Sequence, residues 1–295
     1  MLREATTLPG EGGSFEVLRH LDPLRDRYLR DHQLGGRPVL PMAVACELMA
    51  EVAALAGSGL EVVAVRSLKV LHGIVMGNGP RTIRIVATPR GGTSGKATEI
   101  AVTITGIEDD QRPCYRAVVE LASGLSSAGS IQPPSFRELR PFPLSVEEAY
   151  RQWLFQGPLF RGLVAVNGVQ ADGISGSLRP SSPVELIAGG PDVPWLIDPV
   201  VIDSGLQLYI LWARLHWDMI PLPSRFQAYR RHGRLTGPQV DCRVRIRPES
   251  GSGILHADLF FLDSDGHMLG VLEDVEAACQ RPVDRVPAGQ SHDMD

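Results

Sequence analysis

The 295-residue sequence predicts an α+β fold made of two similar halves. Two long apolar helical patterns, near residues 42–56 and 200–217, are each accompanied by segments that alternate between apolar and polar residues. Apolar residues at helical spacing indicate core-facing helices, and strict alternation indicates half-buried strands. Short connections between successive strands favour antiparallel pairing. We therefore expect two antiparallel sheets, each wrapped around a long helix.

The composition excludes several functional classes. A net charge of −5 and scattered arginines do not suggest a nucleic-acid-binding or polybasic membrane surface. No apolar run is long enough to cross a bilayer, and the N-terminus lacks the apolar core of a signal peptide. The cysteines at 46, 114, 242 and 279 form no metal-binding spacing and are expected to be reduced. These features predict a cytoplasmic protein without a bound metal.

The first half is expected to span residues 14–122, after a flexible N-terminus at 1–13. It begins with a short strand over residues 14–20. Pro41 suits the first turn of a helix, which should end near Ala56 because Gly57 provides a stop signal. Further strands are predicted near residues 62–73, 81–88, 97–105 and 113–122.

Residues 123–143 form a predicted linker rich in glycine, serine and proline, followed by a second half over residues 144–281. Ser145 and Glu148 have the spacing of a capping box, which predicts a short helix to about Leu154. Asp198 and Pro199 are a good N-cap and first residue for the second long helix. Strands are predicted near 163–170, 173–179, 226–231, 240–247, 253–262 and 268–278, before a disordered tail at 282–295.

The segment over residues 31–42 carries the first candidate site. His32 precedes a Gly-Gly pair, which permits a sharp turn, and Pro41 then opens a helix. This arrangement predicts an imidazole close to a helix N-terminus. The unpaired N–H groups of such a terminus can stabilise a developing negative charge.

Asp203 is the second candidate, because it lies in a helix that is apolar on almost every side. Burial raises the pKa of a carboxyl group and keeps a neutral acid available near neutral pH. Gln207 is four residues further on and therefore shares the same helix face. We expect its amide to hydrogen-bond Asp203 and fix the rotamer. The alternative is that Asp203 only complements the helix dipole at a solvated position.

Three motifs occur in order between about Phe15 and Ala278, and together they resemble the dehydratase domains of modular polyketide synthases. They are His32-x-x-x-Gly36-x-x-x-x-Pro41, Gly157-Pro158-x-Phe160 and Asp203-x-x-x-Gln207. The resemblance implies a double hotdog fold, in which the two sheets join side by side. It also implies an acyl chain carried on the 4'-phosphopantetheine of an acyl carrier protein, entering a tunnel between the halves. The chain itself would bind no cofactor, and a homodimer is left open.

The implied reaction is loss of water from a β-hydroxyacyl thioester, giving an α,β-unsaturated thioester. The resemblance implies that His32 and Asp203 are the catalytic pair. A neutral imidazole is suited to act as the base, and a protonated carboxyl group is suited to act as the acid. Backbone donors for the thioester oxygen are expected at the helix start after Pro41 and around Gly157. Substrate-binding or supporting roles fall on Gly36, Leu40, Pro41, Met42, Gln156, Gly157, Pro158, Phe160 and Gln207.

Two positions depart from the family pattern. Gln156 replaces the usual tyrosine before Gly-Pro, and Met42 replaces the usual glycine after the motif proline. Gln156 can replace the hydrogen bonding of a tyrosine only in part, and Met42 brings a flexible apolar side chain to the tunnel. A cyclase or product-shaping variant of the same fold therefore stays open. A non-catalytic hotdog module that binds acyl chains is the alternative from a different class.

Overall fold

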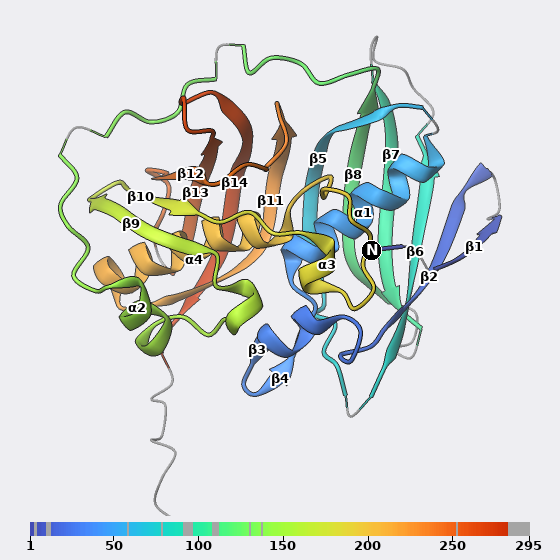
Figure 1. Cartoon of the computed structure of the whole chain (residues 1–295), viewed down its shortest axis with the longest axis horizontal. Coiled ribbons are helices and arrows are strands. Elements are labelled where there is room, and N and C mark those ends of the chain that lie inside the picture. The colour runs from blue at the N-terminus through green and yellow to red at the C-terminus, as the bar shows by residue number, and fades with distance from the viewer. Residues whose placement is uncertain are drawn as a thin grey trace, which may run out of the picture.

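A single antiparallel sheet of twelve strands runs through both halves of the chain (Figure 1). The computed structural model describes residues 1–282, apart from 3–4, 10–12, 58, 78, 91–96, 108–111, 130, 137 and 252. The strand order is β1-β2-β6-β7-β8-β5-β11-β14-β13-β12-β10-β9. Strands of the first half therefore occupy one side of the sheet, and strands of the second half occupy the other.

The first half places one long helix, α1 (Met42–Ala56), against its strands. The helix contacts β5, β6, β7 and β8, so its apolar residues are buried beneath the sheet. Alternate residues of these strands point towards it, because side chains in a strand alternate between the two faces. The strands are β1 (Thr6–Pro9), β2 (Phe15–Leu21), β5 (Glu61–Val70), β6 (Arg81–Pro89), β7 (Thr98–Gly106) and β8 (Pro113–Ala122).

The second half places α4 (Pro199–Trp217) against β9, β10, β11 and β12. The Asp198 side chain accepts hydrogen bonds from Val200 N and Val201 N, as expected of an N-cap. The predicted capping box of Ser145 and Glu148 is confirmed at the start of α2 (Val146–Gln152). The strands are β9 (Leu163–Gln170), β10 (Gly173–Leu178), β11 (Ile220–Arg231), β12 (Val240–Ile246), β13 (Ile254–Leu262) and β14 (Met268–Gln280).

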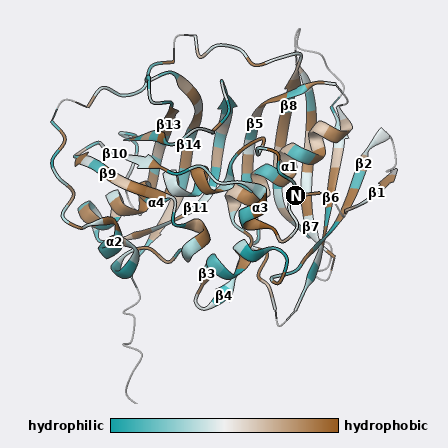
Figure 2. Ribbon diagram, in the orientation of Figure 1, coloured by the Kyte–Doolittle hydropathy of each residue, from teal (hydrophilic) through white to brown (hydrophobic). Residues whose placement is uncertain are grey.

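The halves join where β5 pairs antiparallel with β11, from Lys69 opposite Arg225 to Ala64 opposite Arg230. Helices α1 and α4 also contact one another, and much of the sheet around them is apolar, coloured brown in Figure 2. One buried cluster of apolar side chains includes residues of both helices and both sets of strands. The two halves therefore share one core.

The smaller elements lie near the junction. They are the 3-10 helix η2 (Arg27–Asp31), the short strands β3 (Gln33–Leu34) and β4 (Arg37–Pro38), the 3-10 helix η3 (Pro158–Phe160) and helix α3 (Pro183–Leu186). The segment between β8 and α2 has no regular element among its described residues beyond an isolated bridge between Arg140 and Val169. None of the helices in the described part of the chain is long and apolar enough to cross a membrane.

Two expectations require correction. The N-terminus at 1–13 was expected to be flexible, but Thr6–Pro9 forms β1 and pairs with β2. The strand predicted at 226–231 begins at Ile220 instead. Its first residues, which include Pro221 and Pro223, do not pair with β5, so the missing proline N–H groups cost no hydrogen bond to that strand. Of the tail expected to be disordered, residues 283–295 lie outside the described residues.

Candidate functional site

The position of His32 is fixed by a tight hairpin. The residue follows η2, and β3 and β4 then turn through Gly35 and Gly36, both of which have positive φ angles (58° and 75°) that favour glycine. The hairpin brings Val39 back to His32, so that Val39 N donates to the His32 carbonyl oxygen at 3.0 Å. The Val39 carbonyl oxygen lies 3.1 Å from His32 Nδ1. Because a carbonyl oxygen can only accept, Nδ1 carries the hydrogen and Nε2 is left with its lone pair.

Asp203 lies on the second turn of α4 and is buried, with 5% of its surface exposed. This burial argues against the solvated, dipole-complementing alternative. Gln207 Nε2 donates to Asp203 Oδ2 at 2.8 Å, which confirms the expected hydrogen bond one turn along the helix. Gln156 Nε2 also donates to Oδ2, at 3.2 Å. Two neutral amides therefore surround one oxygen of the carboxyl group.

The two halves bring His32 and Asp203 together. His32 Nε2 lies 3.9 Å from Asp203 Oδ1, which confirms the proximity expected from the motifs. Both side chains line a cavity of about 170 Å³ between the halves. Apart from these two residues the lining is almost entirely uncharged and apolar. It consists of Leu34, Val39, Leu40, Met42, Val70, Gly73, Tyr115, Phe155, Gln156, Leu206, Ile210, Pro221, Leu222 and Pro223.

The loop that carries Gly157 and Pro158 is hydrogen-bonded to Asp31, the residue before His32. Gly157 N donates to the Asp31 carbonyl oxygen at 2.7 Å, and Leu159 N donates to Asp31 Oδ2 at 2.8 Å. A Cβ atom on Gly157 would lie 2.4 Å from Asp31 Oδ1, so only glycine permits this approach. The N–H of Gly157 itself is therefore already used, and a donor at a neighbouring position around Gly157 stays a prediction. Phe160 packs against the His32 ring, with centroids 5.7 Å apart.

The start of α1 still offers donors beside the cavity. Its N-cap, Pro41, makes no side-chain cap hydrogen bond, and the first intrahelical bond runs from Ala45 N to the Pro41 carbonyl oxygen. The N–H groups of Met42, Ala43 and Val44 therefore precede the helical hydrogen-bond ladder. Met42 itself lines the cavity, as its place after the motif proline suggested. The helix dipole adds positive potential at the same point.

Burial moves the pKa values of both candidate residues towards their neutral forms. Desolvation lowers the pKa of the His32 imidazole from its usual value, although the adjacent Asp203 charge acts in the opposite direction. Desolvation also raises the pKa of Asp203, against the opposing effects of His32 and the amides of Gln207 and Gln156. The site therefore favours a neutral imidazole beside a protonated carboxyl group.

The sequence did not indicate the wall of the cavity that β5 and β11 form. These strands pair only as far as Lys69 and Arg225, and Pro221, Leu222 and Pro223 lie beyond that point. Proline has no N–H to donate, so the strands separate there and leave space between the halves. The Pro-x-Pro spacing before a predicted strand was the available signal.

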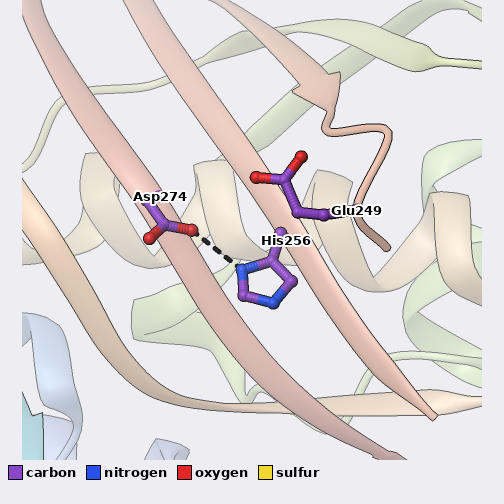
Figure 3. A group of neighbouring side chains, drawn as sticks. All are labelled: Glu249, His256 and Asp274. Atoms are coloured by element: carbon purple, nitrogen blue, oxygen red, sulfur yellow. Dashed lines mark hydrogen bonds and ion pairs between the residues drawn. The ribbon is translucent and has the colours of Figure 1, made fainter. Parts of the chain in front are cut away.

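Two groups of potential metal ligands exist among the described residues, and both lie away from this cavity. One consists of Asp263, Asp265 and His267 in the turn between β13 and β14. In the other, Asp274 Oδ1 lies 2.8 Å from His256 Nδ1, with Glu249 beside the same ring (Figure 3). Neighbouring guanidinium groups already pair with both carboxylates, since Arg225 lies 3.6 Å from Asp274 and Arg247 lies 3.3 Å from Glu249. Ion pairing accounts for this second group.

Comparison with known proteins identifies the family. Residues 1–105 match a family model described as the polyketide synthase dehydratase domain. Residues 133–286, just over half of the chain, match a model described as the polyketide synthase dehydratase N-terminal domain. The chain belongs to the polyketide synthase dehydratase family.

Solved structures share the fold across almost the whole chain. The dehydratase domain from the CurK module of curacin polyketide synthase has a TM-score of 0.73 at 18% identity, covering 95% of this chain and 97% of that one. The CurF-module domain has a TM-score of 0.71 at 19% identity, covering 95% and 98%. These similarities confirm the double hotdog fold.

A curated relative is similar in sequence. It is a polyunsaturated fatty acid synthase subunit from Thraustochytrium sp. (strain ATCC 26185 / S-3), and it is 28% identical over 222 residues, which cover 72% of this chain. The match spans only 8% of that relative's length, so it corresponds to one region of a much larger protein.

Proposed function

We propose that the protein removes water from a β-hydroxyacyl chain carried on the 4'-phosphopantetheine of an acyl carrier protein, giving an α,β-unsaturated thioester. The observation that carries the proposal is the 3.9 Å separation of His32 Nε2 and Asp203 Oδ1 at the wall of an apolar cavity. Family membership supports the same reaction class. The relative in polyunsaturated fatty acid synthesis is consistent with an apolar, fatty-acid-like chain.

His32 acts as the base. Its Nδ1–H is held by the Val39 carbonyl oxygen, so the free Nε2 lone pair removes a proton from the α-carbon. The electrons of the C–H bond form the new double bond, and the C–O bond to the β-hydroxyl breaks. Asp203 gives its proton to the departing hydroxyl, which leaves as water. The reaction ends with an imidazolium and a carboxylate side by side, and a proton returning from His32 to Asp203 restores both groups.

The negative charge that develops on the thioester oxygen needs a donor in place before the reaction. The N-terminus of α1 is the proposed source, because Met42 lines the cavity and its N–H precedes the helical hydrogen-bond ladder. Base and acid lie next to each other, so they reach an α-hydrogen and a β-hydroxyl on the same face of the substrate. The proposed elimination is therefore a syn elimination.

The test is turnover of a β-hydroxyacyl-pantetheine, followed by the same acyl group loaded on an acyl carrier protein. The expected product has lost one water and contains a conjugated double bond. A product of unchanged mass identifies a cyclase instead. Binding without any conversion, by a folded protein, identifies a non-catalytic acyl-binding module. The His32→Ala variant is the matched control, because any conversion that it retains does not come from this site.

A further inference from the structure

Gln156 and Gln207 are held with their amide nitrogens towards the same oxygen of Asp203. The Gln207 Nε2 group also donates to the Phe160 carbonyl oxygen at 2.8 Å, and a carbonyl oxygen can only accept. Gln156 Oε1 accepts from Phe155 N at 3.2 Å, and a backbone N–H can only donate. The backbone therefore fixes the orientation of both amides, and neither can turn its oxygen to Asp203 without losing a partner.

This arrangement distinguishes the two oxygens of the carboxyl group. A protonated carboxyl has one oxygen that carries the hydrogen and one carbonyl oxygen that only accepts. The two amide N–H groups at 2.8 Å and 3.2 Å occupy Oδ2, so a proton there would point at groups that are themselves donors. Oδ1 has His32 Nε2 at 3.9 Å, and no side-chain amide of the described residues donates to it. We infer that Gln156 acts with Gln207 to keep the acidic proton of Asp203 on Oδ1, the oxygen that faces the catalytic base.

This inference rests on the proposed function and makes Gln156 a positioning residue. It also gives a physical meaning to the replacement of the family's usual tyrosine at this position. A tyrosine hydroxyl can both donate and accept, so it could receive a carboxyl proton on the Oδ2 side. The Gln156 NH₂ group can only donate, and Phe155 N prevents the amide from turning over. Glutamine therefore excludes the unproductive position of the proton more strictly than tyrosine does.

Removing the Gln156 amide should have two linked effects. The Gln156→Met variant keeps a similar side-chain length but leaves one Oδ2 acceptor position free, so the proton can spend part of its time there. We expect kcat to fall by about 2- to 12-fold, the change in an equilibrium that one neutral hydrogen bond typically causes. We also expect the alkaline limb of the kcat profile to move to higher pH, because the carboxylate has lost a donor that stabilises it. The KM should change less than kcat, because the amide does not act on the acyl chain.

The control variant is Leu206→Ala, which changes the lining of the same cavity and removes no hydrogen bond from Asp203. Its kcat is free to change. The alkaline limb should not move to higher pH, because a smaller side chain at this position reduces the desolvation that raises the pKa of Asp203. If Leu206→Ala moves that limb as far as Gln156→Met does, general disturbance of the cavity explains the effect and the inference is wrong.

A measurement without substrate separates this inference from the proposed function. The carboxyl carbon of Asp203 can be followed by ¹³C NMR across pH in protein labelled at aspartate, with Asp203→Asn used to assign the signal. The midpoint should be higher in Gln156→Met than in the unsubstituted protein, and an unchanged midpoint in a folded variant overturns the inference. Gln156→Leu provides the same test if the methionine variant does not fold. Absence of turnover in the unsubstituted protein would reject the proposed function, whereas the titration still decides the role of Gln156.

Discussion

The Asp203→Asn variant tests the assignment of the acid most directly, because the structure predicts that it loses turnover but not stability. An asparagine oxygen at the Oδ2 position can accept from both Gln207 and Gln156, and its NH₂ group then faces His32 Nε2. The hydrogen bonds of the buried site are therefore kept. Below about pH 3.9, where the carboxyl group is protonated in both the folded and the unfolded protein, the free energy of unfolding should change by less than about 1 kcal/mol. The amide cannot give a proton to the leaving hydroxyl.

The expected loss of turnover is about 10²–10⁴-fold, the typical contribution of general acid catalysis. This factor corresponds to about 2.7–5.4 kcal/mol of activation free energy. The assay pairs a melting curve with kcat on a saturating β-hydroxyacyl-pantetheine. Asp203→Ala is the matched variant, because it leaves two buried amide donors without an acceptor, at about 1–3 kcal/mol each. A folded Asn variant that retains most of its turnover would show that Asp203 is structural and that the acid lies elsewhere.

Other consequences follow from the same contacts. Because the pKa of Asp203 is raised in the folded protein, its contribution to stability is fully present below about pH 3.9 and is lost as pH rises through the folded pKa. Asp203→Asn should therefore gain stability relative to the unsubstituted protein as pH increases, and denaturant melts that show a constant difference would contradict this. Gly157→Ala should reduce the free energy of unfolding by about 1–3 kcal/mol and lower kcat, because its Cβ would overlap Asp31. The control is Gly77→Ala, whose Cβ would have no neighbour within 4 Å, and its free energy of unfolding in the same melts should match that of the unsubstituted protein. Pre-incubation with a chelator should leave turnover unchanged, because side chains supply both acid and base, and a loss that zinc or iron restores would refute this.

Much of the fold could be predicted from local patterns. The period of the apolar residues indicated both long helices, and α4 ends at the predicted Trp217 after the predicted Asp198 cap. The predicted strands at 163–170 and 113–122 coincide with β9 and β8. These features are local, because helix caps, turn glycines and alternation depend on neighbours in sequence. The start of β11 was missed because Pro221 and Pro223 were interpreted as the end of regular structure. Proline is accommodated there because this part of β11 does not pair with β5.

The sequence by itself determined which residue types are available for the chemistry: one histidine before a tight turn, one aspartate on an apolar helix and a glutamine one turn later. Only the tertiary structure decided that His32 and Asp203 meet, because the pairing of β5 with β11 and the contact of α1 with α4 join segments that are distant in the chain. It also decided that Gly157 N is occupied by Asp31, and that Gln156 and Gln207 share one carboxyl oxygen. The geometry of these contacts depends on packing between elements, and no local periodicity contains that information.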